Sequence, residues 1–245
     1  MHADRALLAL LLSLTPLAAV AAECAADSAP NRTPLVTLFT SEGCISCPPA
    51  DRWLSRLRGR DDLVALAFHV DYWDHIGWKD RFGSPRNTAR QRAWADMKGA
   101  RTIYTPQVLV NDTDAFAWRT RDPLAAIDRR VPTGADIHLS ATPGAEGIAV
   151  EARAQTEHAG GGRLVVARFE HDHVSKVTEG ENHGATLRHD FVVRQWDSRK
   201  VEPGTPLSLQ LTFPPAEKPG GIAAFVEDPT TGEVLQALAL PDCTP

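Results

Sequence analysis

The chain has 245 residues, 43% of them hydrophobic and 23% charged, and a formal net charge of −5 at pH 7. These values suit a soluble globular protein of one or two domains. The arginines are scattered and no basic stripe carries interleaved aromatic residues, so nucleic acid is not expected as a partner.

Residues 1–22 are expected to lie outside the fold. Arg5 precedes an apolar run that ends in small residues suited to cleavage after Ala22 or Ala21. This pattern predicts a secretory signal peptide, and hence a periplasmic or secreted chain with no stable membrane span after cleavage. The alternative is an N-terminal membrane anchor, but the run is short for a span and contains Pro16.

Residues 23–132 are expected to form an α/β thioredoxin-like domain. Apolar runs predict buried strands, and apolar residues at helical spacing predict helices, the second with Ala89, Ala93 and Met97 as its apolar stripe. The resulting order, β-α-β-α-β-β-α, is that of the minimal thioredoxin architecture. In chain order the expected elements are a strand at 35–39, a helix at 48–59, a strand at 63–68, a helix at 85–99, strands at 108–110 and 115–118, and a helix from Asp122-Pro123.

Residues 133–245 are expected to form an antiparallel β-sandwich-like domain. About seven apolar or alternating segments are separated by turns rich in glycine and proline, with almost no helical pattern. The segments cover residues 137–139, 148–150, 164–169, 191–196, 207–213, 222–226 and 234–240.

Two cysteines separated by two residues stand between the first expected strand and the first expected helix. A helix N-terminus stabilises a thiolate, which is the species that attacks a disulfide. Cys44, expected nearer the helix tip and solvent, is the predicted nucleophile, and Cys47 is predicted to resolve the mixed disulfide. The pair predicts thiol–disulfide exchange.

The other two cysteines stand near the ends of the expected mature chain. Because chain termini often lie near one another, Cys24 and Cys243 are predicted to form a structural disulfide. Such a long loop would contribute at most roughly 5 kcal/mol in the chain-entropy model. The alternative is two unpaired thiols.

Thr105-Pro106 stands at the start of an expected strand. The bond is predicted to be cis, with an ordinary trans bond at the start of a strand as the alternative. A cis bond would turn the backbone of Thr105 toward an extended substrate beside the cysteines. Trp73 and Trp78 are predicted to form the apolar wall of the same substrate groove, with simple packing as the alternative.

Two carboxylates are candidates for proton relay. Glu42 lies two residues before Cys44; the alternative to a relay role is that it is a solvated carboxylate of the loop. Asp71 follows the second expected strand, at the sheet edge where open α/β sheets place their ligands.

Several blocks in combination resemble an exported bacterial thioredoxin-like family that is catalogued as a domain of unknown function. The resemblance implies a thioredoxin-like fold able to hold a redox centre, and it supplies no substrate. Gly43 and Ile45-Ser46 differ from the residues of classical thioredoxins, a difference that bears on the redox potential. The blocks are Ser41-Glu42-Gly43-Cys44-x-x-Cys47-Pro48-Pro49-Ala50-Asp51, His69-Val70-Asp71-Tyr72-Trp73-Asp74, Gly77-Trp78-x-Asp80-x-Phe82, Arg90-Gln91, Tyr104-Thr105-Pro106-Gln107 and Gly180-Glu181-Asn182-x-Gly184.

Metal binding is the competing chemistry. Cys44, Cys47 and His69 would offer thiolate and imidazole ligands to copper or zinc, but no second ligand pair at zinc-site spacing is present. His171 and His173 are expected on one face of a strand, and together with His183 and His189 further along they are interpreted as surface histidines. No metal or cofactor is predicted.

The sequence thus predicts an exported thiol–disulfide oxidoreductase whose partner is a protein or a small thiol. The alternative is a non-catalytic module that binds a peptide or a copper or zinc ion, with the Cys44–Cys47 pair as a static disulfide.

Overall fold

The computed structural model describes residues 23–125, 127 and 130–243, so the predicted signal peptide lies outside the described residues. Over that part of the chain there are fourteen strands, two α-helices and one short 3₁₀-helix. The helices are α1 (Pro48–Ser55), α2 (Pro85–Met97) and the short η1 (Asp74–Ile76). The strands are β1 (Cys24–Asp27), β2 (Leu35–Thr40), β3 (Val64–His69), β4 (Gln107–Val110), β5 (Thr113–Asp114), β6 (Asp136–Gly144), β7 (Gly147–Gln155), β8 (Gly162–Glu170), β9 (His173–Lys176), β10 (Thr186–His189), β11 (Val192–Val201), β12 (Leu207–Phe213), β13 (Gly220–Glu227) and β14 (Val234–Pro241).

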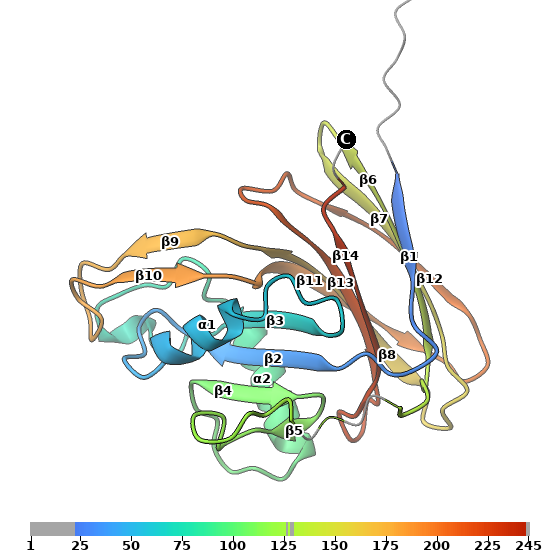
Figure 1. Ribbon diagram of the computed structural model, residues 1–245, viewed down its shortest axis with the longest axis horizontal. Coiled ribbons are helices and arrows are strands. Elements are labelled where there is room, and N and C mark those ends of the chain that lie inside the picture. Colours follow the sequence, from blue (N-terminus) through green and yellow to red (C-terminus); the bar gives the residue numbers. More distant parts are fainter. Residues whose placement is uncertain (1–22, 126, 128–129, 244–245) are drawn as a thin grey trace, which may run out of the picture.

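Eight strands form one mixed sheet in the order β14-β13-β8-β11-β3-β2-β4-β5 (Figure 1). The junction between the two halves of the chain is the parallel pairing of β11 with β3. There Val192 lies opposite Ala67, and the Ala67 N–H donates to the Phe191 carbonyl at 2.8 Å. Strands from both halves therefore share one hydrogen-bonded sheet.

The predicted fold class, an α/β thioredoxin-like domain followed by an antiparallel β-sandwich-like domain, is wrong. The described residues are mostly strands with only two α-helices, and the largest sheet is mixed and runs through both halves. A strand buried along its whole length needs partners for its backbone groups on both sides. β3 is such a strand, and β11 supplies the second partner. The limits at residues 23–132 and 133–245 stay a prediction.

The eight-stranded sheet separates two hydrophobic cores. Neighbouring residues of an extended strand point to opposite faces. Val165 of β8 and Phe225 of β13 belong to the core that includes β2, β3 and α1. Val166 and Ala224, one residue away, belong to the core beneath the second sheet, which has the order β1-β6-β7-β12. Figure 1 shows this four-stranded sheet across β13 and β14 from the helices.

A disulfide between Cys24 and Cys243 joins the two sheets near the ends of the described chain, as predicted. Cys24 begins β1 in the four-stranded sheet, opposite Ala141 of β6. Cys243 follows β14, the edge strand of the eight-stranded sheet. The bond spans 219 residues of sequence, with the two Cα atoms 5.8 Å apart.

The C-terminal end of the first half differs from the prediction. The strand expected at residues 115–118 is wrong, because the two-residue strand β5 ends at Asp114 after a tight turn at Asn111. The expected helix from Asp122-Pro123 is replaced by a turn over residues 123–125; residue 126 and residues 128–129 lie outside the described residues.

Helix α2 begins as predicted but buries a different face. Ser84 is the N-cap, and its hydroxyl accepts from the Arg86 N–H at 3.2 Å. The expected apolar stripe is wrong, since Ala89 and Ala93 are exposed and the buried face is largely polar, formed by Asn87, Thr88, Gln91 and Ala95. Neither α-helix of the described chain is long and apolar enough to cross a membrane.

Candidate functional site

The cysteine loop connects β2 to α1. Strand β2 is buried throughout and ends at Thr40, and Cys47 occupies the N-cap position of α1, before Pro48. The loop closes through turns in which the Cys44 N–H donates to Ser41 and the Cys47 N–H donates to Cys44. The pair therefore precedes the helix rather than occupying its first turn.

Cys44 and Cys47 are joined in a disulfide with their Cα atoms 5.4 Å apart. Cys44 is 1% exposed and Cys47 is 0% exposed, so the expectation that Cys44 lies near solvent is wrong in this disulfide form. Ile45 and Ser46, the two residues between them, are exposed. Gly43 leaves room for Trp73, because a Cβ at Gly43 would lie 2.9 Å from the Trp73 Cβ.

The Thr105–Pro106 segment lies beside this disulfide, and its peptide bond is cis, as predicted. Ser46 links the two: its hydroxyl lies 3.3 Å from the Cys44 sulfur and donates to the Thr105 carbonyl at 3.5 Å. The Trp73 indole N–H donates to the Thr105 hydroxyl at 2.8 Å. Thus Cys44, Trp73 and Thr105, predicted at separate points of the chain, form one cluster.

Trp78 and Glu42 form a second contact at the cysteine loop. The Trp78 indole N–H donates to Glu42 Oε2 at 2.8 Å, and both tryptophans are half-buried. Glu42 is 1% exposed and is not a solvated loop carboxylate. Burial raises the pKa of Glu42, but the hydrogen bonds with His189 and Ser175 and the positive charge of His189 together outweigh this and leave the pKa below its ordinary value.

Asp71, the other predicted relay group, lies apart from Glu42. Its carboxylate accepts a hydrogen bond from the Thr88 hydroxyl of α2, and its backbone N–H donates to the same hydroxyl at 3.2 Å. These contacts fix the start of the segment that carries Trp73. They give Asp71 a structural contact with α2.

A buried polar cluster lies beneath the cysteine loop. His189 of β10 lies 3.2 Å from Glu42 Oε1 and 3.7 Å from Asp51 Oδ1 of α1. Burial lowers the pKa of His189, but the carboxylates of Asp51 and Glu42 together outweigh this effect and raise the pKa to about 10.

A second buried pair continues this cluster. His69 Nδ1, at the end of β3, lies 2.6 Å from Asp80 Oδ2. The same carboxylate accepts from the Glu42 N–H at 2.9 Å, which ties the pair to the cysteine loop. Burial raises the pKa of Asp80, and the attraction of His69 reverses this, so the pKa lies below its ordinary value.

The C-terminal half of the chain holds the loop in place. The Asn182 amide donates to the carbonyls of Glu42 at 2.8 Å and Cys44 at 3.1 Å. Glu181 accepts from the Ile45 N–H at 3.2 Å. The Gly180-Glu181-Asn182 motif of the second half thus binds the cysteine loop of the first half.

Sequence reasoning missed several of these residues. His189 and His173 are buried, so their interpretation as surface histidines is wrong; His183 is exposed. His171 and His173 do not share a strand, because β8 ends at Glu170 and β9 begins at His173. The position of Asp51 could have been predicted, because it follows Cys47 by four residues and therefore lies on the same face of the helix. The burial of His189 could also have been predicted, because it lies two residues after the apolar Leu187 and therefore on the same face of β10.

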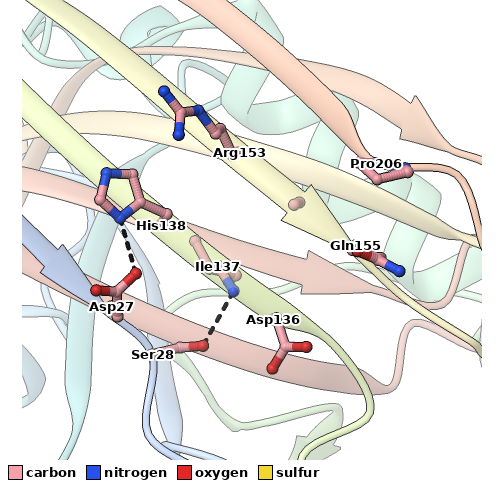
Figure 2. A pocket seen from close by; sticks show the side chains of 9 residues that line it. Asp27, Ser28, Asp136, Ile137, His138, Arg153, Gln155 and Pro206 are labelled. Atoms are coloured by element: carbon pink, nitrogen blue, oxygen red, sulfur yellow. Dashed lines mark hydrogen bonds and ion pairs between the residues drawn. The ribbon is translucent and has the colours of Figure 1, made fainter.

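A separate cavity of about 360 Å³ lies on the four-stranded sheet (Figure 2). His138 Nδ1 lies 2.7 Å from Asp27 Oδ1 along its wall, and the Ile137 N–H donates to the Ser28 hydroxyl at 3.0 Å. These contacts join β1 and the residue after it to β6. The cavity shares no residue with the cysteine loop.

A family model described as "Protein of unknown function (DUF1223)" matches residues 35–227. The chain belongs to this family. It is also similar to a protein from Agrobacterium tumefaciens of known crystal structure, with 29% sequence identity and a TM-score of 0.63 over 86% of this chain and 94% of that one. A search of curated proteins found no match.

Proposed function

We propose that this chain is an exported protein that exchanges disulfides with a thiol-bearing partner through Cys44 and Cys47. The observation that supports this most is the position of the pair. Cys47 is the N-cap of α1, and Cys44 shares a cluster with Ser46, Trp73 and the Thr105 carbonyl. A helix N-terminus stabilises a thiolate at Cys47, which is the group that leaves when a partner thiolate attacks Cys44.

The exchange conserves thiols and disulfides. A partner thiolate attacks the Cys44 sulfur, the Cys44–Cys47 bond breaks, and Cys47 leaves as a thiolate. Attack on the new mixed disulfide by a second partner thiolate then releases an oxidised partner and leaves both cysteines reduced. In the opposite direction the reduced Cys44 thiolate attacks a partner disulfide, and Cys47 displaces the partner.

Export is supported by the two disulfides. Disulfides persist in secreted and periplasmic proteins and are rare in reducing compartments. The Cys24–Cys243 bond has no place in the exchange reaction and serves as a permanent cross-link. The chain would then carry one structural and one reactive disulfide in the same compartment.

A different function is favoured by one observation: both sulfur-bearing residues of the loop are buried. A module whose Cys44–Cys47 bond never opens would show the same burial. Exchange requires the exposed turn at Ile45 and Ser46 to shift so that a partner thiolate reaches the Cys44 sulfur. The two functions differ in whether Cys44 ever forms a mixed disulfide.

Trapping separates them. In a Cys47→Ala variant the resolving thiol is absent, so exchange at Cys44 should leave a partner covalently attached, visible by non-reducing electrophoresis and mass spectrometry. A Cys44→Ala, Cys47→Ala variant is the matched control. A Cys47→Ala protein that reacts with small alkylating agents but never with disulfide-bonded proteins or glutathione disulfide would contradict the proposal.

A further inference from the structure

The geometry points to a buried site for a zinc-class divalent transition metal, formed by Asp51, His69 and His189. One nitrogen of each imidazole and one Asp51 oxygen all lie within 4.8 Å of one another. Ligands about 2.0–2.2 Å from a tetrahedral zinc ion lie about 3.3–3.6 Å apart. His189 Nδ1 and Asp51 Oδ1, at 3.7 Å, are already close to that separation. This site does not depend on the proposed exchange reaction, since no cysteine belongs to it.

Each imidazole of the cluster has one unpaired nitrogen. His69 Nε2 and His189 Nδ1 are buried and have no hydrogen-bond partner among the described residues. His69 is 0% exposed and His189 is 2% exposed, so water does not satisfy them at the surface. The nearest carboxylate oxygen to His189 Nδ1, Asp51 Oδ1, is 3.7 Å away, which is too long for a hydrogen bond.

The opposite nitrogen of each ring faces a carboxylate. His69 Nδ1 lies 2.6 Å from Asp80 Oδ2, and His189 Nε2 lies 3.2 Å from Glu42 Oε1. A carboxylate accepts the ring proton, orients the imidazole and leaves the other nitrogen to bind a metal. Both histidines of the cluster thus have the outer carboxylate partner that metal-binding histidines have.

The surroundings favour a small cation with nitrogen ligands. Two imidazoles and one carboxylate suit zinc, iron, cobalt or nickel better than calcium or magnesium, which prefer oxygen. The Phe82 ring packs against both imidazoles, with centroid distances of 5.2 Å to His69 and 5.8 Å to His189. Asp51, Glu42 and Asp80 would balance the charge of the ion.

A second cluster in the same region lacks these features. Glu170, His173 and Glu217 also lie within reach of one another. However, His173 Nε2 lies 2.8 Å from Glu170 and His173 Nδ1 lies 3.2 Å from Arg81, so both ring nitrogens have partners. Arg194 also contacts Glu170 and supplies positive charge where an ion would sit. This comparison singles out the Asp51 cluster.

Because all three ligands are buried, the ion would enter during folding or when the β9–β10 hairpin lifts from α1. The test therefore refolds the full mature chain from denaturant with equimolar Co²⁺ or Zn²⁺, removes loose metal by gel filtration, and measures bound metal per chain. We expect one ion per chain, visible absorption bands for Co²⁺, and an X-ray absorption shell of nitrogen and oxygen with two imidazoles and no sulfur.

Variants separate the site from the alternatives. Asp51→Asn and His189→Gln should each lower metal affinity at least tenfold, whereas His183→Gln, an exposed histidine of the same hairpin region, should leave it unchanged. A Cys44→Ser, Cys47→Ser variant should still bind one ion. No retained metal in the refolded wild type, a sulfur shell, or equal affinity in the Asp51→Asn and wild-type chains would each overturn the site.

Discussion

The two disulfides of this chain have similar geometry between their Cα atoms but very different surroundings. Cys24–Cys243 closes 219 residues and joins two sheets, next to an apolar core. Cys44–Cys47 closes a turn of four residues and lies over a cluster of buried charges that includes Glu42, Asp51 and His189. The first bond constrains the whole chain, and the second constrains a single turn.

Loop size makes this difference quantitative. In the chain-entropy model a loop of about 220 residues contributes roughly 5 kcal/mol and one of about four residues roughly 2 kcal/mol. A gain in the free energy of unfolding therefore explains why the chain has the Cys24–Cys243 bond better than it explains the Cys44–Cys47 bond. The position of the short bond at a helix N-cap accounts for it as a reactive group.

The largest expected effect is on exchange activity. Cys44→Ser should abolish the catalysed reduction of a disulfide-bonded test protein, because Cys47, the remaining thiol of the loop, is fully buried and is proposed to resolve the mixed disulfide rather than to attack. The Cys24→Ser, Cys243→Ser variant should keep its activity at a temperature where it is folded. If alkylation of the reduced protein labels Cys47 faster than Cys44, the assignment of the nucleophile is wrong.

The next effect is on stability. Replacing both Cys24 and Cys243 with serine should lower the free energy of unfolding by up to roughly 5 kcal/mol, whereas the same change at Cys44 and Cys47 should cost no more than roughly 2 kcal/mol. Urea unfolding followed by tryptophan fluorescence measures both. Equal losses for the two pairs would remove the distinction on which the comparison depends.

A buried ion pair links the same halves of the chain without a covalent bond. Glu227 of β13 lies 2.7 Å from Arg90 of α2 and 2.7 Å from Arg163 of β8. Burial raises the pKa of Glu227, but the two guanidinium groups outweigh this and hold the pKa below its usual value of 4.5. Its contribution to stability is therefore present above pH 4.5 and is lost as the pH falls through the lower folded pKa.

Glu227→Gln tests this link. Leaving Arg90 without its partner should cost about 3 kcal/mol near neutral pH. The loss should shrink at acid pH, because protonation removes the same charge from the wild type. Unfolding free energies at several pH values measure both effects, with the exposed Glu146→Gln as control. A loss that does not change with pH would show that Glu227 contributes through packing alone.

The smallest expected effect concerns the loop itself. Asn182→Ala removes two hydrogen bonds to the cysteine loop, each worth about 0.5–1.5 kcal/mol. Reduction of Cys44–Cys47 by dithiothreitol should become several-fold faster, while reduction of Cys24–Cys243 keeps its rate. His183→Ala, next in sequence and exposed, is the control. Equal acceleration of both bonds would indicate general loosening instead.

Local patterns in the sequence predicted much of this molecule. The apolar runs gave β2 and β3, and helical spacing gave α1, within a few residues, because each is fixed by its own burial. Helix α2 also begins where predicted, but its buried face is largely polar and is not the expected apolar stripe. The terminal disulfide followed from the usual proximity of chain ends. The cluster of Cys44 with Thr105 and Trp73 followed from strand order.

Long-range pairing was beyond those patterns. The residues of β3 do not specify β11 as its pairing partner, since many apolar strands would satisfy the same backbone groups. The polar face of α2 was missed because Gln91 donates to Tyr104 and Gln107, residues that periodicity cannot bring near it. His189 was missed because its partners, Glu42 and Asp51, lie more than a hundred residues away in sequence.

One measurement tests the central distinction between the two disulfides. The oxidised chain is equilibrated with graded ratios of reduced and oxidised glutathione, and at lower potentials of reduced and oxidised dithiothreitol. Each mixture is quenched by alkylation and mapped by mass spectrometry for each bond separately. The account predicts a Cys44–Cys47 midpoint in the range of known exchange proteins, about −120 to −270 mV, with Cys24–Cys243 still oxidised there. A Cys44–Cys47 midpoint below about −300 mV, the range of structural disulfides, would contradict it.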